Sequence, residues 1–220
     1  MDLQNKIIDF LGDSITEGVG VADRENNRYD NVLKRECHLK AVYNYGIGGT
    51  RIAPQRQPSP DPVYDRYFLT RVEEMIPDAD IVVIFGGTND FGHGDAPLGK
   101  PEDRGENTFC GAMHALLEKL IDRYPYAQLV VMTPIHREDE ERIEYGDLGA
   151  PRQARLEDYV NAISAVSGYY AVPVLDLFRT SGMQPRIPLM KRLYNPDGLH
   201  PNDAGHRKIA ERLIGFLNTL

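Results

Sequence analysis

Five short apolar segments alternate with longer segments of helical periodicity, and this alternation constrains the fold more than any other feature of the chain. The short segments are rich in Val and Ile and are bounded by Gly, Pro or Asp, as strands usually are; they lie at 7–11, 41–45, 81–85, 129–132 and 172–175. The helical segments lie at about 29–38, 62–76, 106–124, 153–169 and 202–219. Because most of the strands are continuously apolar, they are expected to be buried on both faces between two helical layers. We therefore predict an α/β fold, a doubly wound three-layer α/β/α sandwich with a five-stranded parallel sheet, in one domain spanning 1–220.

Three stretches break this alternation. Residues 91–106 are rich in Gly, Pro and charge, and residues 136–152 are dense in acids, so both are expected to be exposed loops, with at most a short helix. Residues 177–196 contain three prolines that discourage regular structure. Since long connections are usually binding loops or lids, we expect these stretches to form the walls of a pocket.

The charge balance excludes several classes of partner. Lys and Arg number 25 against 33 Asp and Glu, which gives a formal charge of −8 and disfavours nucleic acid and anionic lipid as partners. The chain starts with a polar segment without the pattern of a secretory signal, and its apolar runs are far shorter than the roughly 20 residues of a membrane span. A cytoplasmic location is the expectation. The two cysteines, Cys37 and Cys110, form no pattern typical of a disulfide framework or zinc site.

Polar side chains follow the strands at positions where chemistry is expected. In open α/β sheets ligands bind beyond the carboxyl ends of the strands. Residues 12–18 follow the first strand, 46–51 the second and 86–90 the third, while 197–200 precede the last helix. These four segments are therefore expected to converge on one site.

The residues in these segments match the requirements of nucleophilic catalysis. Ser14, on a tight glycine-led turn, would be the nucleophile, but a serine hydroxyl needs a base, for which His200 is the candidate. Asp197 could hold the second ring nitrogen of that histidine. The backbone N–H groups of Ser14 and Gly49 and the amide of Asn89 could donate to an oxyanion.

The sequence resembles the GDSL-type serine esterases, also called SGNH hydrolases. The resemblance is carried by GDS at 12–14, the glycine of NYGIGGT at Gly49, the asparagine of GGTND at Asn89, and DGLHPN with Asp197 and His200. These blocks occur in the family's order and span almost the whole chain. The resemblance implies a flavodoxin-like sandwich and the roles given above, although in the second block Gly48 is an alternative to Gly49.

Each motif also has a purely structural interpretation. Gly12–Ser14 could be an ordinary strand-to-helix turn, Asn89 and Asp197 turn residues, and His200 part of a helix start. Arg51, His93 and His136 are candidate substrate contacts, with a surface ion pair as the alternative for Arg51 and simple exposure as the alternative for the histidines.

We predict a serine hydrolase that cleaves carboxylic esters through an acyl-serine intermediate, without cofactor or metal. The expected partner is a small-molecule ester with a short acyl or acetyl group on a small polar or carbohydrate alcohol. The alternatives are an acyltransferase with the same triad, a lysophospholipase or thioesterase, and a noncatalytic flavodoxin-like binding module. The sequence is compatible with self-association but does not require it.

Overall fold

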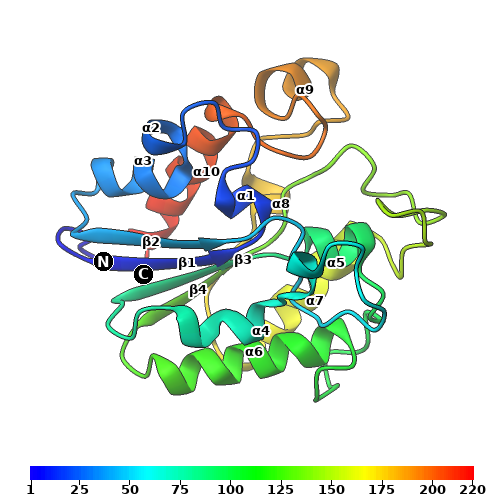
Figure 1. The fold of residues 1–220 in the computed structure, drawn as a ribbon. Coiled ribbons are helices and arrows are strands. Elements are labelled where there is room, and N and C mark those ends of the chain that lie inside the picture. Colours follow the sequence, from blue (N-terminus) through cyan, green and yellow to red (C-terminus); the bar gives the residue numbers. More distant parts are fainter.

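The computed structural model describes residues 1–220, and its centre is a five-stranded sheet in which every neighbouring pair of strands is parallel (Figure 1). The strand order is β2-β1-β3-β4-β5, which is the flavodoxin-like order, so the predicted fold class is confirmed. The strands are β1 (Ile7–Gly12), β2 (Ala41–Gly46), β3 (Ile81–Phe85), β4 (Gln128–Met132) and β5 (Val174–Leu175). Gly12 lies level with Gly46 on one side and with Phe85 on the other. The segments that follow β1, β2 and β3 therefore leave the sheet at one edge.

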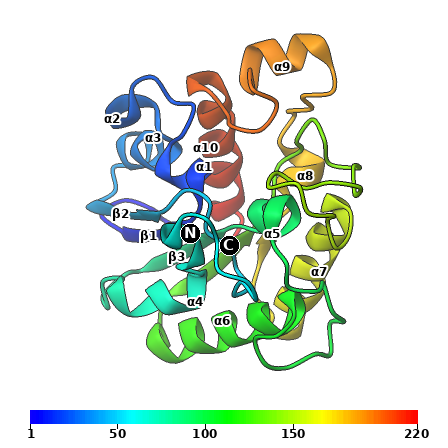
Figure 2. The ribbon, with the colours of Figure 1, turned by 45° about the vertical axis from the view of Figure 1, so that its right-hand side comes forward.

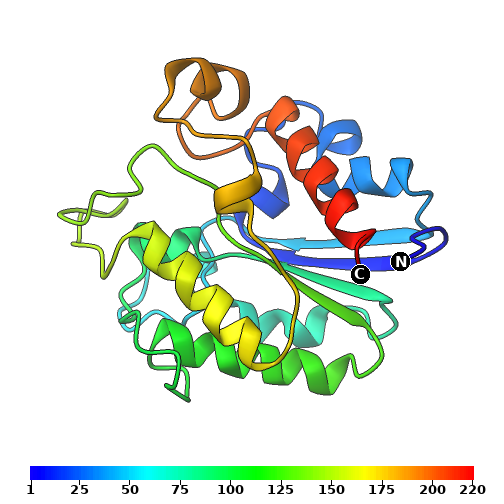
Figure 3. The ribbon, with the colours of Figure 1, turned by 180° about the vertical axis from the view of Figure 1, so that it is seen from behind.

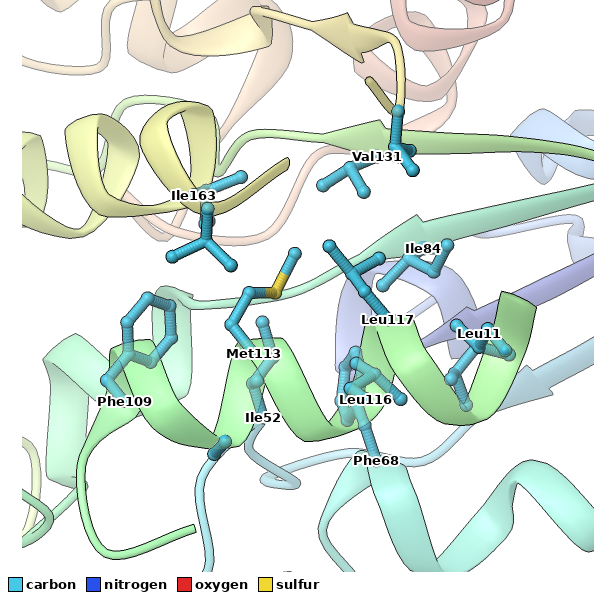
Figure 4. Close-up of a cluster of buried hydrophobic side chains, with 14 of the residues drawn as sticks. Leu11, Ile52, Phe68, Ile84, Phe109, Met113, Leu116, Leu117, Val131 and Ile163 are labelled. Carbon is cyan, nitrogen blue, oxygen red and sulfur yellow. The ribbon is translucent and has the colours of Figure 1, made fainter. Parts of the chain in front are cut away.

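Alternate strand residues face two separate cores. Leu11, Ile84 and Val131 belong to the core beneath the helices α6 (Phe109–Arg123) and α7 (Leu156–Tyr169), where they face Met113 and Leu117 (Figure 4). The neighbouring strand residues, among them Ile8, Phe10, Val83 and Val130, belong to the second core. Helices α3 (Tyr29–Glu36) and α10 (Asp203–Leu217) cover that face, as the view from behind shows for α10 (Figure 3). Burial of both sheet faces explains why the strands read as continuous apolar runs.

The predicted helix at 62–76 is interrupted, which is a correction to the sequence analysis. It consists of η1 (Pro62–Asp65), α4 (Phe68–Arg71) and η2 (Val72–Glu74). The N–H of Phe68 donates to the carbonyl of Arg51 at 2.9 Å, outside the segment. This tertiary hydrogen bond, with the Phe68 ring in the core, replaces the continuous helical ladder.

The stretch 177–196 is also more regular than its prolines indicate. It contains α8 (Leu177–Thr180) and α9 (Pro188–Tyr194), and α9 stands out from the body of the molecule (Figure 2). Pro188 occupies the first turn of α9, where the missing N–H has no helical partner to lose. Three further short helices complete the chain: α1 (Ser14–Glu17), α2 (Arg24–Asn27) and α5 (Thr88–His93). None of the helices combines the length and the apolar character that crossing a bilayer requires.

Candidate active site

The structure brings Ser14 and His200 together from opposite ends of the chain. Ser14 is the first residue of α1, directly beyond β1, and the side chain of Asp13 caps that short helix by accepting from the N–H of Ile15. The Ser14 Oγ lies 3.0 Å from the Nε2 of His200. The Nδ1 of His200 lies 2.7 Å from the Oδ2 of Asp197. Serine, imidazole and carboxylate thus form one hydrogen-bonded chain, the geometry that activates a serine hydroxyl.

The loop that carries Asp197 and His200 is organised by Asp197 itself. Its Oδ1 accepts from the N–H groups of Leu199 at 2.8 Å and His200 at 2.7 Å, while Gly198 takes a left-handed φ of 85°. Partial burial opposes ionisation of Asp197, but the hydrogen bonds from Leu199 and from the backbone and ring of His200 outweigh it and lower its pKa. Asp197 is therefore ionised at neutral pH, as a partner of an imidazolium must be.

The glycines after β2 differ in whether their N–H groups are available. The N–H of Gly48 donates to the Oε2 of Glu17 at 2.7 Å. Gly49 has a φ of 73°, its N–H has no acceptor within the protein, and a Cβ there would lie 2.3 Å from the ring of Tyr64. The side-chain nitrogen of Asn89 uses one hydrogen on the carbonyl of Thr50 at 2.9 Å, which leaves the other free. The free donors are thus Gly49 and Asn89, not Gly48.

A buried polar layer lies beneath these donors. Asp90 accepts from the N–H groups of Ile52 at 3.0 Å and Ala53 at 2.8 Å, and so holds the segment after β2 against α5. Arg71 donates to the carbonyls of Tyr45 and Gly12 and thereby ties the ends of β2 and β1 together. Burial raises the pKa of Asp90 to about 6.

Asp13 is the second carboxyl group of this layer. Burial, with a smaller contribution from the charge of Asp90, raises its pKa to about 7 against the hydrogen bond from Ile15 and the charge of Arg71. Asp13 directly precedes Ser14, and Asp90 directly follows Asn89. The two aspartates hold these residues in place but do not line the cavity.

The candidate residues open into a cavity of about 620 Å³. Its lining combines six apolar side chains with carboxylates, imidazoles and backbone: Ser14, Glu17, Val19, Gly46, Ile47, Gly48, Gly49, Val63, Tyr64, Asn89, His93, Asp147, Leu148, Leu199 and His200. No group of three or more His, Cys, Asp or Glu side chains converges so as to hold a metal ion.

Comparison with known proteins decides the family. The family model described as "GDSL-like Lipase/Acylhydrolase family" matches residues 10–208. The chain belongs to this family. The resemblance found in the sequence is thereby confirmed, and the GDSL-like protein is a carboxylic ester hydrolase. The noncatalytic binding module is set aside.

Solved structures resemble the hydrolase over their whole length. A Lactobacillus plantarum protein is 34% identical, with 98% of each chain covered and a TM-score of 0.83. The aryl esterase of M. smegmatis is 18% identical, with 98% of this chain and 99% of that chain covered and a TM-score of 0.69. An acetyl xylan esterase is 21% identical, with 96% and 99% covered and a TM-score of 0.62. No curated protein matches this sequence.

Of the three predicted substrate contacts in the hydrolase, only His93 lines the cavity. Arg51 is 1% exposed, and its guanidinium donates to Ser59, to the carbonyl of Tyr64 and to Asp65, so it is neither a surface ion pair nor a cavity residue. His136 packs against the ring of Phe178 and hydrogen bonds Glu140 at 2.7 Å, away from the cavity.

The loop 136–152 of the hydrolase is mostly exposed, as predicted, but a few of its side chains are buried. Arg137 and Arg152 are buried, and each forms ion pairs with both Asp139 and Asp147. Both guanidinium groups also lie over the ring of Phe91, which is itself buried although it begins the other supposedly exposed loop. This cluster carries Asp147 and Leu148 into the cavity wall.

Sequence reasoning missed the residues that seat His200 in the hydrolase. A Cβ at Gly20 would lie 2.7 Å from the carbonyl oxygen of Pro201, so only glycine permits this approach. Asp203 accepts from the N–H of Ala22 at 2.8 Å and from the side-chain nitrogen of Asn27 at 2.9 Å. The only signal in the sequence was the glycine pair Gly18 and Gly20 near the first motif, and this pair does not show that Pro201 packs against it.

Proposed function

We propose that this hydrolase cleaves short-chain esters of small polar alcohols through an acyl-serine intermediate at Ser14. The observation that carries the proposal is the hydrogen-bonded chain from Ser14 through His200 to Asp197. A serine that merely ended a strand would need no imidazole within 3.0 Å of its hydroxyl.

In the proposed reaction His200 accepts the proton of Ser14 as Oγ attacks the ester carbonyl carbon. The resulting oxyanion receives hydrogen bonds from the N–H groups of Ser14 and Gly49 and from the amide of Asn89. Collapse breaks the bond to the alkoxy group, which leaves as the alcohol with the proton from His200. Water then attacks the acyl-serine with the same base, the acid departs, and Ser14 regains its proton.

The choice of Gly49 over Gly48 as donor is supported by the way Glu17 is used. Because the Glu17 carboxylate already accepts from the N–H of Gly48, that N–H cannot also point to an oxyanion without losing a charge-assisted hydrogen bond. Glu17 therefore acts as a positioning residue that leaves Gly49 as the donor of this segment.

The mixed lining of the cavity supports a short acyl group. Six apolar side chains lie there beside the carboxylates of Glu17 and Asp147 and the imidazoles of His93 and His200. A long acyl chain would have to lie against these polar groups, which favours a short one. One protein of the same fold is an acetyl xylan esterase, which agrees with a small acyl group.

The test compares p-nitrophenyl acetate and butyrate with the decanoate. We expect kcat/KM to fall with chain length and labelling by a fluorophosphonate to occur at Ser14 only. Unchanged hydrolysis by folded Ser14→Ala and His200→Ala variants would contradict the mechanism, and faster turnover of the decanoate would contradict the assignment of the acyl group. Product analysis with added methanol separates hydrolysis from acyl transfer.

A further inference from the structure

The lining of the active-site cavity carries negative charge and no positive charge. Two carboxylates line the cavity, those of Glu17 and Asp147, whereas no lysine or arginine does. The two imidazoles add no positive charge at neutral pH. Burial and the charge of Arg51 lower the pKa of His93 to about 4, and His200 is neutral when it acts as the base. The cavity is therefore expected to attract cations and to repel anions.

The two carboxylates differ in how far the protein neutralises their charge. The Oδ1 of Asp147 accepts from the guanidinium groups of both Arg137 at 2.7 Å and Arg152 at 2.8 Å. The Oε2 of Glu17 accepts from one backbone N–H, and its Oε1 accepts no hydrogen bond within the protein. Its ion pair with Arg24 is long, at 3.8 Å, and Arg24 does not line the cavity. Glu17 is thus the carboxylate that remains able to bind a cation.

The carboxylate of Glu17 lies beside the nucleophile. A Cβ placed on Gly48 would lie 3.0 Å from the Oε2 of Glu17 and 3.7 Å from the Cβ of Ser14. The two side chains therefore border the same space, which the glycine leaves open. A group attached close to the ester bond can reach the carboxylate from there.

The hydrogen bond from Gly48 does not by itself require a carboxylate. The amide oxygen of a glutamine would accept the same N–H. A carboxylate, in contrast, places a negative charge near the oxyanion that forms during attack, and this repulsion opposes catalysis. A substrate that carries a positive charge into the cavity would offset the repulsion.

We propose that Glu17 binds a cationic ammonium group on the alcohol part of the substrate, so that the hydrolase prefers short-chain esters of amino alcohols. The remaining lining suits such a group, since it includes six apolar side chains, among them the ring of Tyr64, which lies against Gly49. The alkyl groups of a substituted ammonium pack against apolar and aromatic surfaces, while its charge faces a carboxylate. An ester that carries a phosphate would be repelled.

This inference rests on the proposed function, because it assumes that the ester is cleaved at Ser14. The experiment compares acetylcholine with 3,3-dimethylbutyl acetate, which has the same shape but a neutral carbon in place of the charged nitrogen. The variant is Glu17→Gln, which keeps an acceptor for the N–H of Gly48 and removes the charge. The matched control is Glu25→Gln, which removes the same charge from an exposed position outside the cavity.

The measured quantity is the ratio of kcat/KM for acetylcholine to kcat/KM for 3,3-dimethylbutyl acetate, because a general loss of activity affects both substrates and cancels. At low salt the unmodified protein should prefer acetylcholine roughly fivefold, the effect of one partly exposed ion pair, and added salt should reduce this preference. Glu17→Gln should lower the ratio to about one, whereas Glu25→Gln should leave it unchanged. A ratio near one in the unmodified protein, or the same ratio in Glu17→Gln, would overturn the inference.

A binding measurement separates this inference from the proposed function. Binding of choline and of 3,3-dimethylbutan-1-ol to Ser14→Ala is followed by NMR titration, with and without Glu17→Gln. Tighter binding of choline that disappears with Glu17→Gln supports the cation site even if Ser14 proves not to be the nucleophile. Equal binding of the two alcohols overturns the cation site and leaves the proposed mechanism at Ser14 intact.

Discussion

The floor and the rim of the candidate active site shift the pKa values of their carboxyl groups in opposite directions. The floor consists of the residues at the strand ends and those directly beneath them, with Asp13 and Asp90, and there burial raises the pKa values to about 7 and about 6. The rim consists of the loop 136–152 and the segment 195–200, with Asp139 and Asp197. There burial acts in the same direction, but hydrogen bonds from Arg152 and Arg137 to Asp139, and from Leu199 and His200 to Asp197, lower the pKa values.

The difference reflects what each carboxyl group does. The floor aspartates accept only from backbone N–H groups and hold the loops of the sheet in register, a task that tolerates a protonated acid. The rim aspartates face cationic or cation-forming side chains, so they must be ionised. Substitutions on the floor should therefore act on stability, and substitutions on the rim should act on catalysis or on loop order.

The largest effect is expected for Ser14, whose hydroxyl on the floor hydrogen bonds His200 on the rim. Ser14→Ala removes this hydroxyl and should lower kcat by roughly 10³–10⁶-fold, with little change in thermal stability. Hydrolysis of p-nitrophenyl acetate measures the loss. Ser164→Ala, which removes a helix-surface hydroxyl bonded only to the carbonyl of Val160, serves as the control and should be fully active.

On the rim, Asp197→Asn should lower kcat by roughly 10²–10⁴-fold, because an amide favours the wrong tautomer of His200 and does not stabilise the imidazolium. The carbonyl oxygen of the asparagine can still accept from Leu199 and His200, so the loop should keep its shape. The midpoint of urea unfolding at neutral pH should fall only slightly, by the contribution that the lowered pKa of the half-exposed Asp197 makes to stability. A large loss of stability would place Asp197 with the floor residues instead.

On the floor, Asp90→Ala should destabilise the protein by about 2–4 kcal/mol, because it leaves the N–H groups of Ile52 and Ala53 buried without acceptors. Urea unfolding followed by circular dichroism measures this value. Asp90→Asn, which keeps one acceptor oxygen, should lose less. Equal stability of both variants and the unmodified protein would mean that these N–H groups find other partners.

The opposite pKa shifts predict opposite dependences of stability on pH. Asp13 has a raised pKa, so the folded protein binds its proton more tightly than the unfolded chain, and its contribution to stability falls as pH rises from about 4 to about 7. Asp13→Asn should therefore gain roughly 1–3 kcal/mol relative to the unmodified protein between pH 5 and pH 8.

Asp139, with a lowered pKa, provides the matched comparison. Its contribution is present above the pKa of the unfolded carboxyl group, near 4, and is lost as pH falls through the folded value. Asp139→Asn should accordingly be most destabilising at neutral pH and least at pH 3. Parallel pH profiles for the Asp13 and Asp139 variants would refute the contrast between floor and rim.

The smallest effect is expected at Glu17, which lines the cavity but acts through Gly48. Glu17→Ala should lower kcat about tenfold with little change in KM, since the glycine segment loses the bond that aims Gly49. Glu17→Gln keeps an acceptor and should recover most of the activity. Equal losses in both variants would show that the charge of Glu17, not its hydrogen bond, matters.

The sequence alone determined the fold class and most of its elements. Strands that are buried on both faces have continuous apolar sequences, and exposed segments do not. The sequence also placed Ser14 and Asn89 beside strand ends, where the structure has them, since parallel strands all end at one edge. It failed where a tertiary contact overrode a local pattern. The loop 136–152 is mostly exposed, as its acids indicate, but nothing in the sequence showed that Arg137 and Arg152 within it are buried over Phe91.

Only the tertiary structure decided the distances and the accessibility of the site. Nothing local to Gly48 or Gly49 tells which N–H is free, because the answer depends on Glu17, 31 residues away from Gly48. Arg51 was predicted to contact substrate, with a surface ion pair as the alternative, but hydrogen bonds to Ser59, Tyr64 and Asp65 hold it in the interior. A periodic pattern records which face of an element is buried, but a hydrogen bond between remote segments depends on how the whole chain packs.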